Sequence, residues 1–522
     1  MPANAERDSV ASLAHSGAWL LTSHLISMGI GLLGLPVLMV ALGTFQFGAW
    51  AVLLGGTFAF GTLELGMSSA VMRWATLAMM PGTDSTEGTG ISAIISNSLV
   101  CTLLVFGIAG IPVLLFAEPL AAWLRLPDTP LLSPGQCIAV VYGTVAFLSL
   151  LRCSIAPLLA TRRMATHARF SLLQSVVGAA TTWTLASTTH RLDLVLIGNT
   201  LAILCVQTMV ALYTRHKLPW RIEPRQLDPR LALAMLRYGV ALQVSGLSTF
   251  VMYQFDKLLI SAVVTPSEVA HYEVASRSAQ ALGNISNAPL ISFAPGLTER
   301  HGLGEDPREQ LLTMLRMTVL GLGFFLLLPL AVAPIGLFAW VGQIGYHAAG
   351  VFVLLELSVI STTLVWPLSL CAQAMGMASA EMRRALGAML INVPASFLLI
   401  SAFGKEGAAL GTLLACLLAN GAFAWWMLRR VDLSWRRLLR TLAPLLVPIL
   451  AITMTLALLG QGVEPLVISS RWYMAPAAAG LYALGIAVLL FWLWRGSALR
   501  PGERNLLASI PARLLPGRFA KR

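Results

Sequence analysis

Apolar stretches long enough to cross a lipid bilayer fill most of this chain of 522 residues. There are about 14 of them, each near the ~20 residues that an α-helix needs to span the hydrocarbon core. Hydrophobic residues make up 57% of the sequence and charged residues 11%, which is outside the usual range for soluble globular proteins. Because a helix satisfies its own backbone hydrogen bonds inside lipid, we expect an all-α polytopic membrane protein.

The predicted spans follow one another with short connections. They are 17–42, 48–72, 91–116, 134–160, 170–187, 192–213, 236–264, 268–295, 311–332, 348–375, 385–402, 407–428, 442–459 and 472–494. No connection is long enough to fold as a separate catalytic domain. A membrane glycosyltransferase or polymerase usually needs such a domain, so the chain is not expected to be an enzyme.

Basic residues concentrate in every second connection, although the net charge of +12 alone would suggest nucleic acid. This alternation follows the positive-inside rule and predicts a multi-pass membrane protein with both termini cytoplasmic and no nucleic-acid partner. The predicted organisation is a cytoplasmic N-terminus (1–16), a six-helix lobe (17–214), a basic cytoplasmic linker (215–235), a second six-helix lobe (236–428), a basic cytoplasmic loop (429–441), two further helices (442–494) and a basic cytoplasmic tail (495–522).

An internal repeat supports the two lobes. Gly17 to Trp50 and Gly239 to Tyr272 have the same spacing, from a helix start to an aromatic residue that opens the next helix. Six crossings in each lobe give both the same orientation, which predicts a parallel pseudo-repeat around a central cavity.

One cofactor motif occurs in the sequence, the dinucleotide-binding pattern GxGxxG at Gly29–Gly34. It lies inside the predicted span 17–42 with no strand before it, so we interpret it as close helix packing. The six cysteines are scattered without a CxxC pair, no HExxH occurs, and no GxxxxGK[ST] occurs. We therefore expect no metal and no cofactor.

Charged side chains inside the predicted helices are the candidate functional residues, because each costs a few kcal/mol in lipid unless it has a partner or faces water. The basic residues predicted to bind substrate are Arg277, Arg152, Lys257 and Arg73. The acidic residues predicted to couple protons or ions are Glu64, Glu356, Asp256 and Glu273.

Structural alternatives remain open for these residues. Arg73 is placed to snorkel to the interface, and Asp256 and Lys257 are near a helix end. Glu273 precedes Arg277 by four residues, the spacing of a helical ion pair, and ordinary interhelical hydrogen bonds would account for the carboxylates. The polar residues of 268–295 favour a helix that lines water.

Three groups of residues carry a family resemblance. They are Phe47–Trp50 with Glu64–Met67, Phe255–Lys257 with Tyr272–Arg277, and Asn392–Leu399 with Phe403–Gly411. In this order and spacing, from about 16 to 428, the chain resembles the polysaccharide transporter family of lipid-linked oligosaccharide flippases (O-antigen, Wzx-type). That family belongs to the multidrug/oligosaccharidyl-lipid/polysaccharide exporter superfamily. The usual acid of the first pattern is Asp, and here it is Glu64.

The resemblance implies a protein of the bacterial inner membrane with two six-helix lobes around a cavity and alternating access. It also implies an undecaprenyl-diphosphate-linked oligosaccharide as cargo for O-antigen or exopolysaccharide synthesis. A groove with Arg277 and Arg152 would then hold the anionic headgroup. Membrane lipid, a polysaccharide polymerase and a chain-length regulator would be its partners. A drug or cation antiporter of the same superfamily and a lipid II flippase remain as alternatives.

Overall fold

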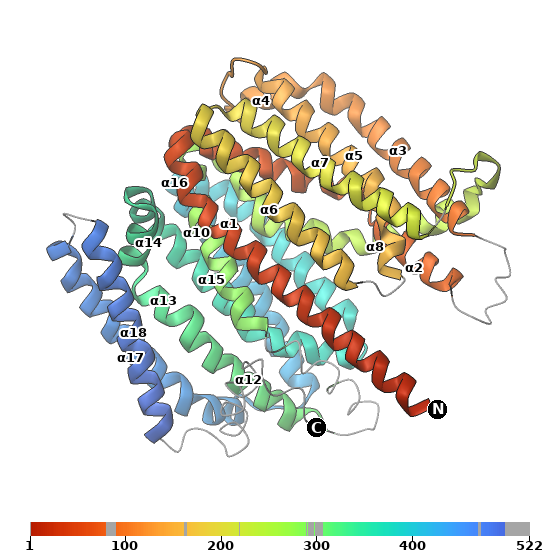
Figure 1. Ribbon diagram of the computed structural model, residues 1–522. Coiled ribbons are helices and arrows are strands. Elements are labelled where there is room, and N and C mark those ends of the chain that lie inside the picture. The colour runs from red at the N-terminus through yellow and green to blue at the C-terminus, as the bar shows by residue number, and fades with distance from the viewer. Residues whose placement is uncertain are drawn as a thin grey trace. The chain divides into compact units, whose positions relative to one another are not determined.

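Helices form the whole of the regular structure in the part of the chain that the computed structural model describes, which comprises residues 2–79, 90–160, 164–218, 220–288, 290, 297, 306–467 and 471–495. In chain order the helices are α1 (Pro2–Gly61), η1 (Thr62–Glu64), α2 (Met67–Ala78), α3 (Ile91–Leu115), α4 (Ala117–Trp123), α5 (Pro134–Ala160), α6 (Met164–Thr189), α7 (Leu192–Lys217), η2 (Pro224–Gln226), α8 (Pro229–Phe250), η3 (Val251–Phe255), α9 (Asp256–Val263), α10 (Pro266–Asn287), α12 (Arg308–Leu322), η5 (Gly323–Leu327), α13 (Leu328–Ala331), α14 (Ala333–Val341), α15 (Gln343–Ala374), α16 (Ala378–Arg430), α17 (Trp435–Val467) and α18 (Arg471–Arg495) (Figure 1). The predicted basic tail at 495–522 lies outside the described residues except for Arg495.

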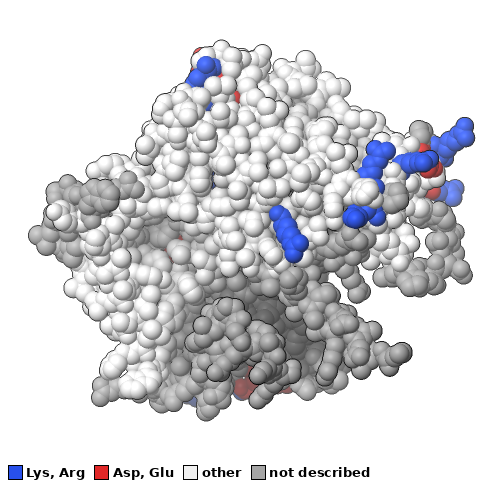
Figure 2. Space-filling model, in the orientation of Figure 1, with Lys and Arg blue, Asp and Glu red and all other residues white. Residues whose placement is uncertain are grey.

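Nine helical segments among the described residues are long and apolar enough to cross a membrane. Two of them, with 43 and 52 residues, are long enough for two crossings each. Each of these two is bent at a glycine with positive φ, Gly43 at 73° and Gly404 at 58°, a conformation that glycine adopts without strain. Figure 2 shows large uncharged areas on the described surface, with Lys and Arg gathered in a few places. The predicted fold class, a polytopic all-α membrane protein, is confirmed.

The helices pack into two compact units. Unit 1 comprises Met1–Ala281, Gly350–Ser358 and Ser379–Ala419, and unit 2 comprises Leu282–Ala349, Val359–Ala378 and Asn420–Arg522. In unit 1, α1 packs on α6, α6 on α7, α7 on α5 and α5 on α3 (Figure 1). In unit 2, α18 packs on α14 and α17, and α17 also packs on α12 and α13. The predicted lobes at 17–214 and 236–428 stay a prediction.

The prediction of an unbroken helix over 48–72 is wrong. Helix α1 ends at Gly61, η1 follows, and Leu65 and Gly66 both adopt left-handed backbone conformations before α2 begins. A Cβ at Gly66 would lie 2.5 Å from the carbonyl oxygen of Gly239, so only glycine permits this approach of α2 to α8. The break places Glu64 directly before α2, where its carboxylate accepts hydrogen bonds from both the backbone N–H (3.3 Å) and the hydroxyl of Ser68.

The predicted helix at 236–264 is also interrupted. It forms α8 and α9 with the single π-helical turn η3 between them, and the turn ends directly before Asp256. Such π-turns within α-helices are often found at functional sites.

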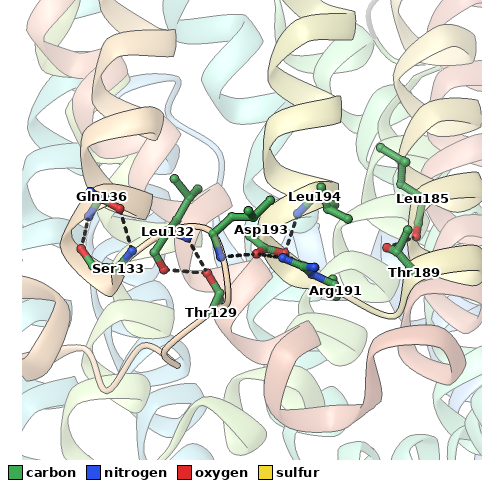
Figure 3. A network of polar contacts seen from close by, with 10 residues as sticks. Thr129, Leu132, Ser133, Gln136, Leu185, Thr189, Arg191, Asp193 and Leu194 are labelled. Atoms are coloured by element: carbon green, nitrogen blue, oxygen red, sulfur yellow. Dashed lines mark hydrogen bonds and ion pairs between the residues drawn. The ribbon is translucent and has the colours of Figure 1, made fainter.

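A carboxylate organises the end of unit 1 at which α7 begins. Asp193 is buried, and its oxygens accept hydrogen bonds from the backbone N–H of Leu131 (3.0 Å) and of Leu194 (2.8 Å). The Arg191 guanidinium completes the network with an ion pair of 2.7 Å to the same carboxylate (Figure 3). Asp193 therefore holds the α4–α5 connection against the start of α7.

The connection between α7 and α8, which lies within the predicted basic linker 215–235, is fixed to the bundle. The Asn97 side chain of α3 donates to the carbonyl of Gln226 (3.0 Å) and accepts from the backbone N–H of Asp228 (3.0 Å). One buried amide thus satisfies two backbone groups of the connection, which positions the start of α8 and, through it, α9.

Candidate functional site

Three charged residues, one from α9 and two from α10, meet in unit 1. The carboxylate of Glu273 contacts both the Lys257 Nζ and the Arg277 Nε. Lys257 and Glu273 are 3% and 1% exposed, so their charges are shielded from solvent and depend on each other. Lys257 and Arg277 together carry one positive charge more than Glu273 neutralises. Asp256, next along α9, is 1% exposed and forms a separate polar cluster.

Arg277 faces a cavity. Its side chain is 36% exposed, and it lines a space of about 300 Å³ whose other walls come from α1, α6 and α7. A Cβ at Gly31 of α1 would lie 3.9 Å from its Nη1. The guanidinium is therefore held by Glu273 on one side and is accessible on the other. A guanidinium placed in this way can bind an oxyanion through charge-assisted hydrogen bonds.

Arg152 and Glu64 form a second pair, with 3.2 Å between the Arg152 Nη1 and the Glu64 Oε2. The Arg152 side chain is 51% exposed and lines a larger cavity of about 460 Å³. The two cavities adjoin, because five residues line both of them. These are Trp50, Leu54, Gln174, Asn199 and Ile203. Unit 1 thus contains two neighbouring cavities, each with an arginine in its wall.

Asp256 lies in a cluster of oxygen atoms from α9, α10 and α16. Its Oδ2 accepts hydrogen bonds from the Tyr272 hydroxyl (2.8 Å) and the Thr412 hydroxyl (2.6 Å), and Asn392 donates to Thr412 (2.9 Å). The Asp256 Oδ1 and the Asn392 Oδ1 are buried and have no hydrogen-bond partner among the described residues. Carboxylate, amide and hydroxyl oxygens are the ligands that hard cations prefer, so this cluster could hold a proton or a small cation.

Glu356 on α15 is a further buried acid of unit 1. It is 0% exposed, and neither of its carboxylate oxygens has a hydrogen-bond partner in the described part of the chain. A group of this kind needs a proton or a cation to offset the cost of burying a charge.

Two of the four predicted basic residues lie away from the cavities. Arg73 on α2 is exposed and stacks over the Tyr238 ring, with 4.5 Å from its Cζ to the ring centroid. Lys257 is directed to Glu273 and to the side-chain oxygen of Gln254 (2.7 Å). Neither residue is among the described residues that line either cavity, so the arrangement gives no support to direct substrate binding by them.

Sequence reasoning missed the neutral polar residues of the site. Gln174 and Asn199 line both cavities, and Thr412 and Asn392 surround Asp256. The signal that would have found them is a single amide or hydroxyl in an otherwise apolar helix.

The all-helical fold and the match to a family model define the class of the protein: a polytopic membrane transporter of the multidrug/oligosaccharidyl-lipid/polysaccharide exporter (MOP) superfamily. Within it, the chain belongs to the polysaccharide biosynthesis protein family, whose model matches residues 13–299. The chain is similar to the structure of the lipid II flippase MurJ in an inward closed conformation, with a TM-score of 0.64, 13% identity, and coverage of 91% of this chain and 99% of that one.

A second structural relative is an inward-facing multidrug resistance MATE family transporter of the MOP superfamily. Its TM-score is 0.52 at 17% identity, over 79% of this chain and 94% of that one. A comparison with curated protein sequences found no match. At these identities the structures establish the fold, while the family match indicates a flippase or transporter of polysaccharide biosynthesis.

Proposed function

We propose that the protein moves an undecaprenyl-diphosphate-linked oligosaccharide from the cytoplasmic to the periplasmic leaflet of the bacterial inner membrane, for O-antigen or exopolysaccharide synthesis. The observation that carries the proposal is Arg277, a guanidinium anchored by Glu273 and open to a cavity inside a membrane-spanning bundle. The family match to polysaccharide biosynthesis proteins supports this choice of cargo.

The physical problem of such cargo is its headgroup. Burying diphosphate charge in hydrocarbon costs far more than thermal energy, whereas the polyprenyl tail can stay in lipid. Arg277 offsets that cost by binding phosphate oxygens, and the membrane potential adds about 2.3 kcal/mol per negative charge moved outward for each 100 mV. Alternating access between two six-helix lobes, 17–214 and 236–428, would expose the headgroup to one side at a time. Both termini are then cytoplasmic, and a polymerase and a chain-length regulator are the expected downstream partners.

Reconstitution tests this function. The purified protein in lipid vesicles is expected to make lipid-linked oligosaccharide accessible to a glycosidase added outside, at a rate well above that of protein-free vesicles. Lipid II and a cationic drug, offered in parallel vesicles, distinguish the two alternatives. Transport of the cationic drug without transport of either diphosphate-linked lipid would contradict the proposal.

We further propose that Asp256 and Glu356 couple transport to a proton or cation gradient, with Glu64 and Glu273 acting as ion-pair partners of Arg152 and Arg277. The Asp256 Oδ1, the neighbouring Asn392 Oδ1 and both carboxylate oxygens of Glu356 have no hydrogen-bond partner among the described residues. This supports the binding of a proton or a cation at these positions.

Replacing Asp256 with asparagine is expected to make transport insensitive to imposed proton and sodium gradients, because the amide keeps the shape of the side chain and loses its charge. The measurement is the transport rate in vesicles with and without each gradient, and Glu356→Gln is treated in the same way. Asp432→Asn, at an exposed carboxylate of the predicted loop 429–441, is the matched control. Unchanged gradient dependence in both buried variants would rule out these two sites of coupling.

A further inference from the structure

The larger cavity of unit 1 has an almost uncharged polar wall. Among the described residues that line this space of about 460 Å³, Arg152 is the one charged side chain, and it is paired with Glu64. The rest of the polar wall consists of carboxamides and threonine hydroxyls, and aromatic rings lie beside them. Ligand sites in proteins usually have this size and this mixture of apolar walls with a few polar groups.

Two carboxamides of the wall, those of Gln174 and Asn199, are held in place by neighbouring side chains. The side-chain oxygen of Gln174 accepts a hydrogen bond from Gln207, and that of Asn199 accepts one from Thr182 at 3.3 Å. The amide nitrogens of Gln174 and Asn199 have no partner within the described part of the chain. Both side chains are therefore oriented hydrogen-bond donors with unused capacity.

Threonine hydroxyls of the same wall provide hydrogen-bond acceptors. The hydroxyls of Thr57 and Thr144 donate to the backbone carbonyls of Leu54 and Val140, each at 2.6 Å. With the proton used in this way, each hydroxyl oxygen can only accept further hydrogen bonds. The Thr144 oxygen also lies 3.3 Å from the Thr200 hydroxyl, which leaves it one further acceptor position. The wall thus presents fixed donors and fixed acceptors side by side.

Donors and acceptors together are what a sugar hydroxyl requires, because it both donates and accepts. A carboxylate of an acidic sugar would instead need a cation, and here the single cation is already paired. Since Trp50, Gln174 and Asn199 line both cavities, a ligand in the larger one adjoins the Arg277 cavity.

We infer that the larger cavity is a binding site for uncharged sugars, namely those nearest the diphosphate of the cargo, with Gln174 and Asn199 as specificity-determining residues. The inference rests on the proposed function, because the diphosphate is assigned there to Arg277. The larger cavity of unit 1 would then recognise the neutral sugars of the cargo, whereas Arg277 recognises the charge of its diphosphate.

The test uses three cargoes in reconstituted vesicles: undecaprenyl diphosphate without sugar, the same lipid with a neutral oligosaccharide, and the same lipid with an oligosaccharide that begins with a uronic acid. In the double variant Gln174→Leu/Asn199→Leu, transport of the neutral-sugar lipid is expected to fall by about tenfold, while the sugar-free lipid changes by less than about twofold. The wild type is expected to prefer the neutral to the acidic cargo. Thr188→Val, at an exposed hydroxyl of α6 that bonds within its own helix, is the matched control.

Equal losses for the sugar-free and the neutral-sugar lipid, or no loss for either, would overturn the inference. Binding separates this result from a failure of the proposed function. Saturation-transfer NMR with a free neutral oligosaccharide should show contact with the wild type and lose it in the double variant. If the wild type moves none of the three cargoes, the proposed function fails, and the NMR result alone decides whether the cavity binds neutral sugars.

Discussion

Replacement of Arg277 with alanine is expected to reduce transport of lipid-linked oligosaccharide to the background of protein-free vesicles, a loss of about 100-fold or more. The guanidinium is the one basic group at the described wall of the smaller cavity, and without it the diphosphate would have to shed its hydration without a compensating charge. Initial rates of cargo exposure in vesicles, at equal amounts of inserted protein, provide the measurement.

Two further variants show whether this loss comes from anion binding. Arg277→Lys keeps the charge but loses the planar fork that binds two phosphate oxygens, so intermediate activity is expected. Arg225→Ala removes the same side chain from an exposed position in the linker and should transport normally. If Arg277→Ala were correctly folded and retained half of the wild-type rate, the cationic wall would play no part in transport.

Replacement of Lys257 with methionine is expected to lower the free energy of unfolding by about 3 kcal/mol, because it removes one partner from a buried ion pair. Glu273 would keep only Arg277 to offset its charge, and Arg277 is partly solvated. Reversible unfolding in mixed micelles, followed by circular dichroism, measures the change.

A double variant tests the cause. In Lys257→Met/Glu273→Gln no charge is left buried without its partner, so part of the lost stability should return. Lys405→Met is the matched control, because Lys405 pairs with Glu268 at 2.7 Å where the carboxylate is about one-third exposed, and such pairs contribute less. A double variant less stable than Lys257→Met would show that the ammonium is not needed to neutralise Glu273.

The helices could be predicted from the sequence where local information determines them. The predicted span 134–160 has the same bounds as α5, because its apolar run begins at a proline and ends before charged residues. The break at Leu65 and Gly66 could not be predicted in this way. It depends on a close approach to Gly239, far away in the sequence, and no pattern within 48–72 contains that information.

The same distinction holds for the site. The ion pair between Glu273 and Arg277 follows from a spacing of four residues on one helix. The pair between Lys257 and Glu273 joins two helices, and the cavities are formed by side chains of several helices, so both require the fold. The charged residues could thus be nominated from the sequence, whereas their separation into cavity-lining and buried groups required the structure.

The glycine bends at Gly43 and Gly404 have a consequence for how the protein meets its surroundings. In each case one crossing passes to the next through a single bent residue, without a loop. A protease needs a length of extended chain in its active site and cleaves preferentially at exposed loops. Neither junction offers such a segment, so proteolytic cleavage is expected at other connections of the chain.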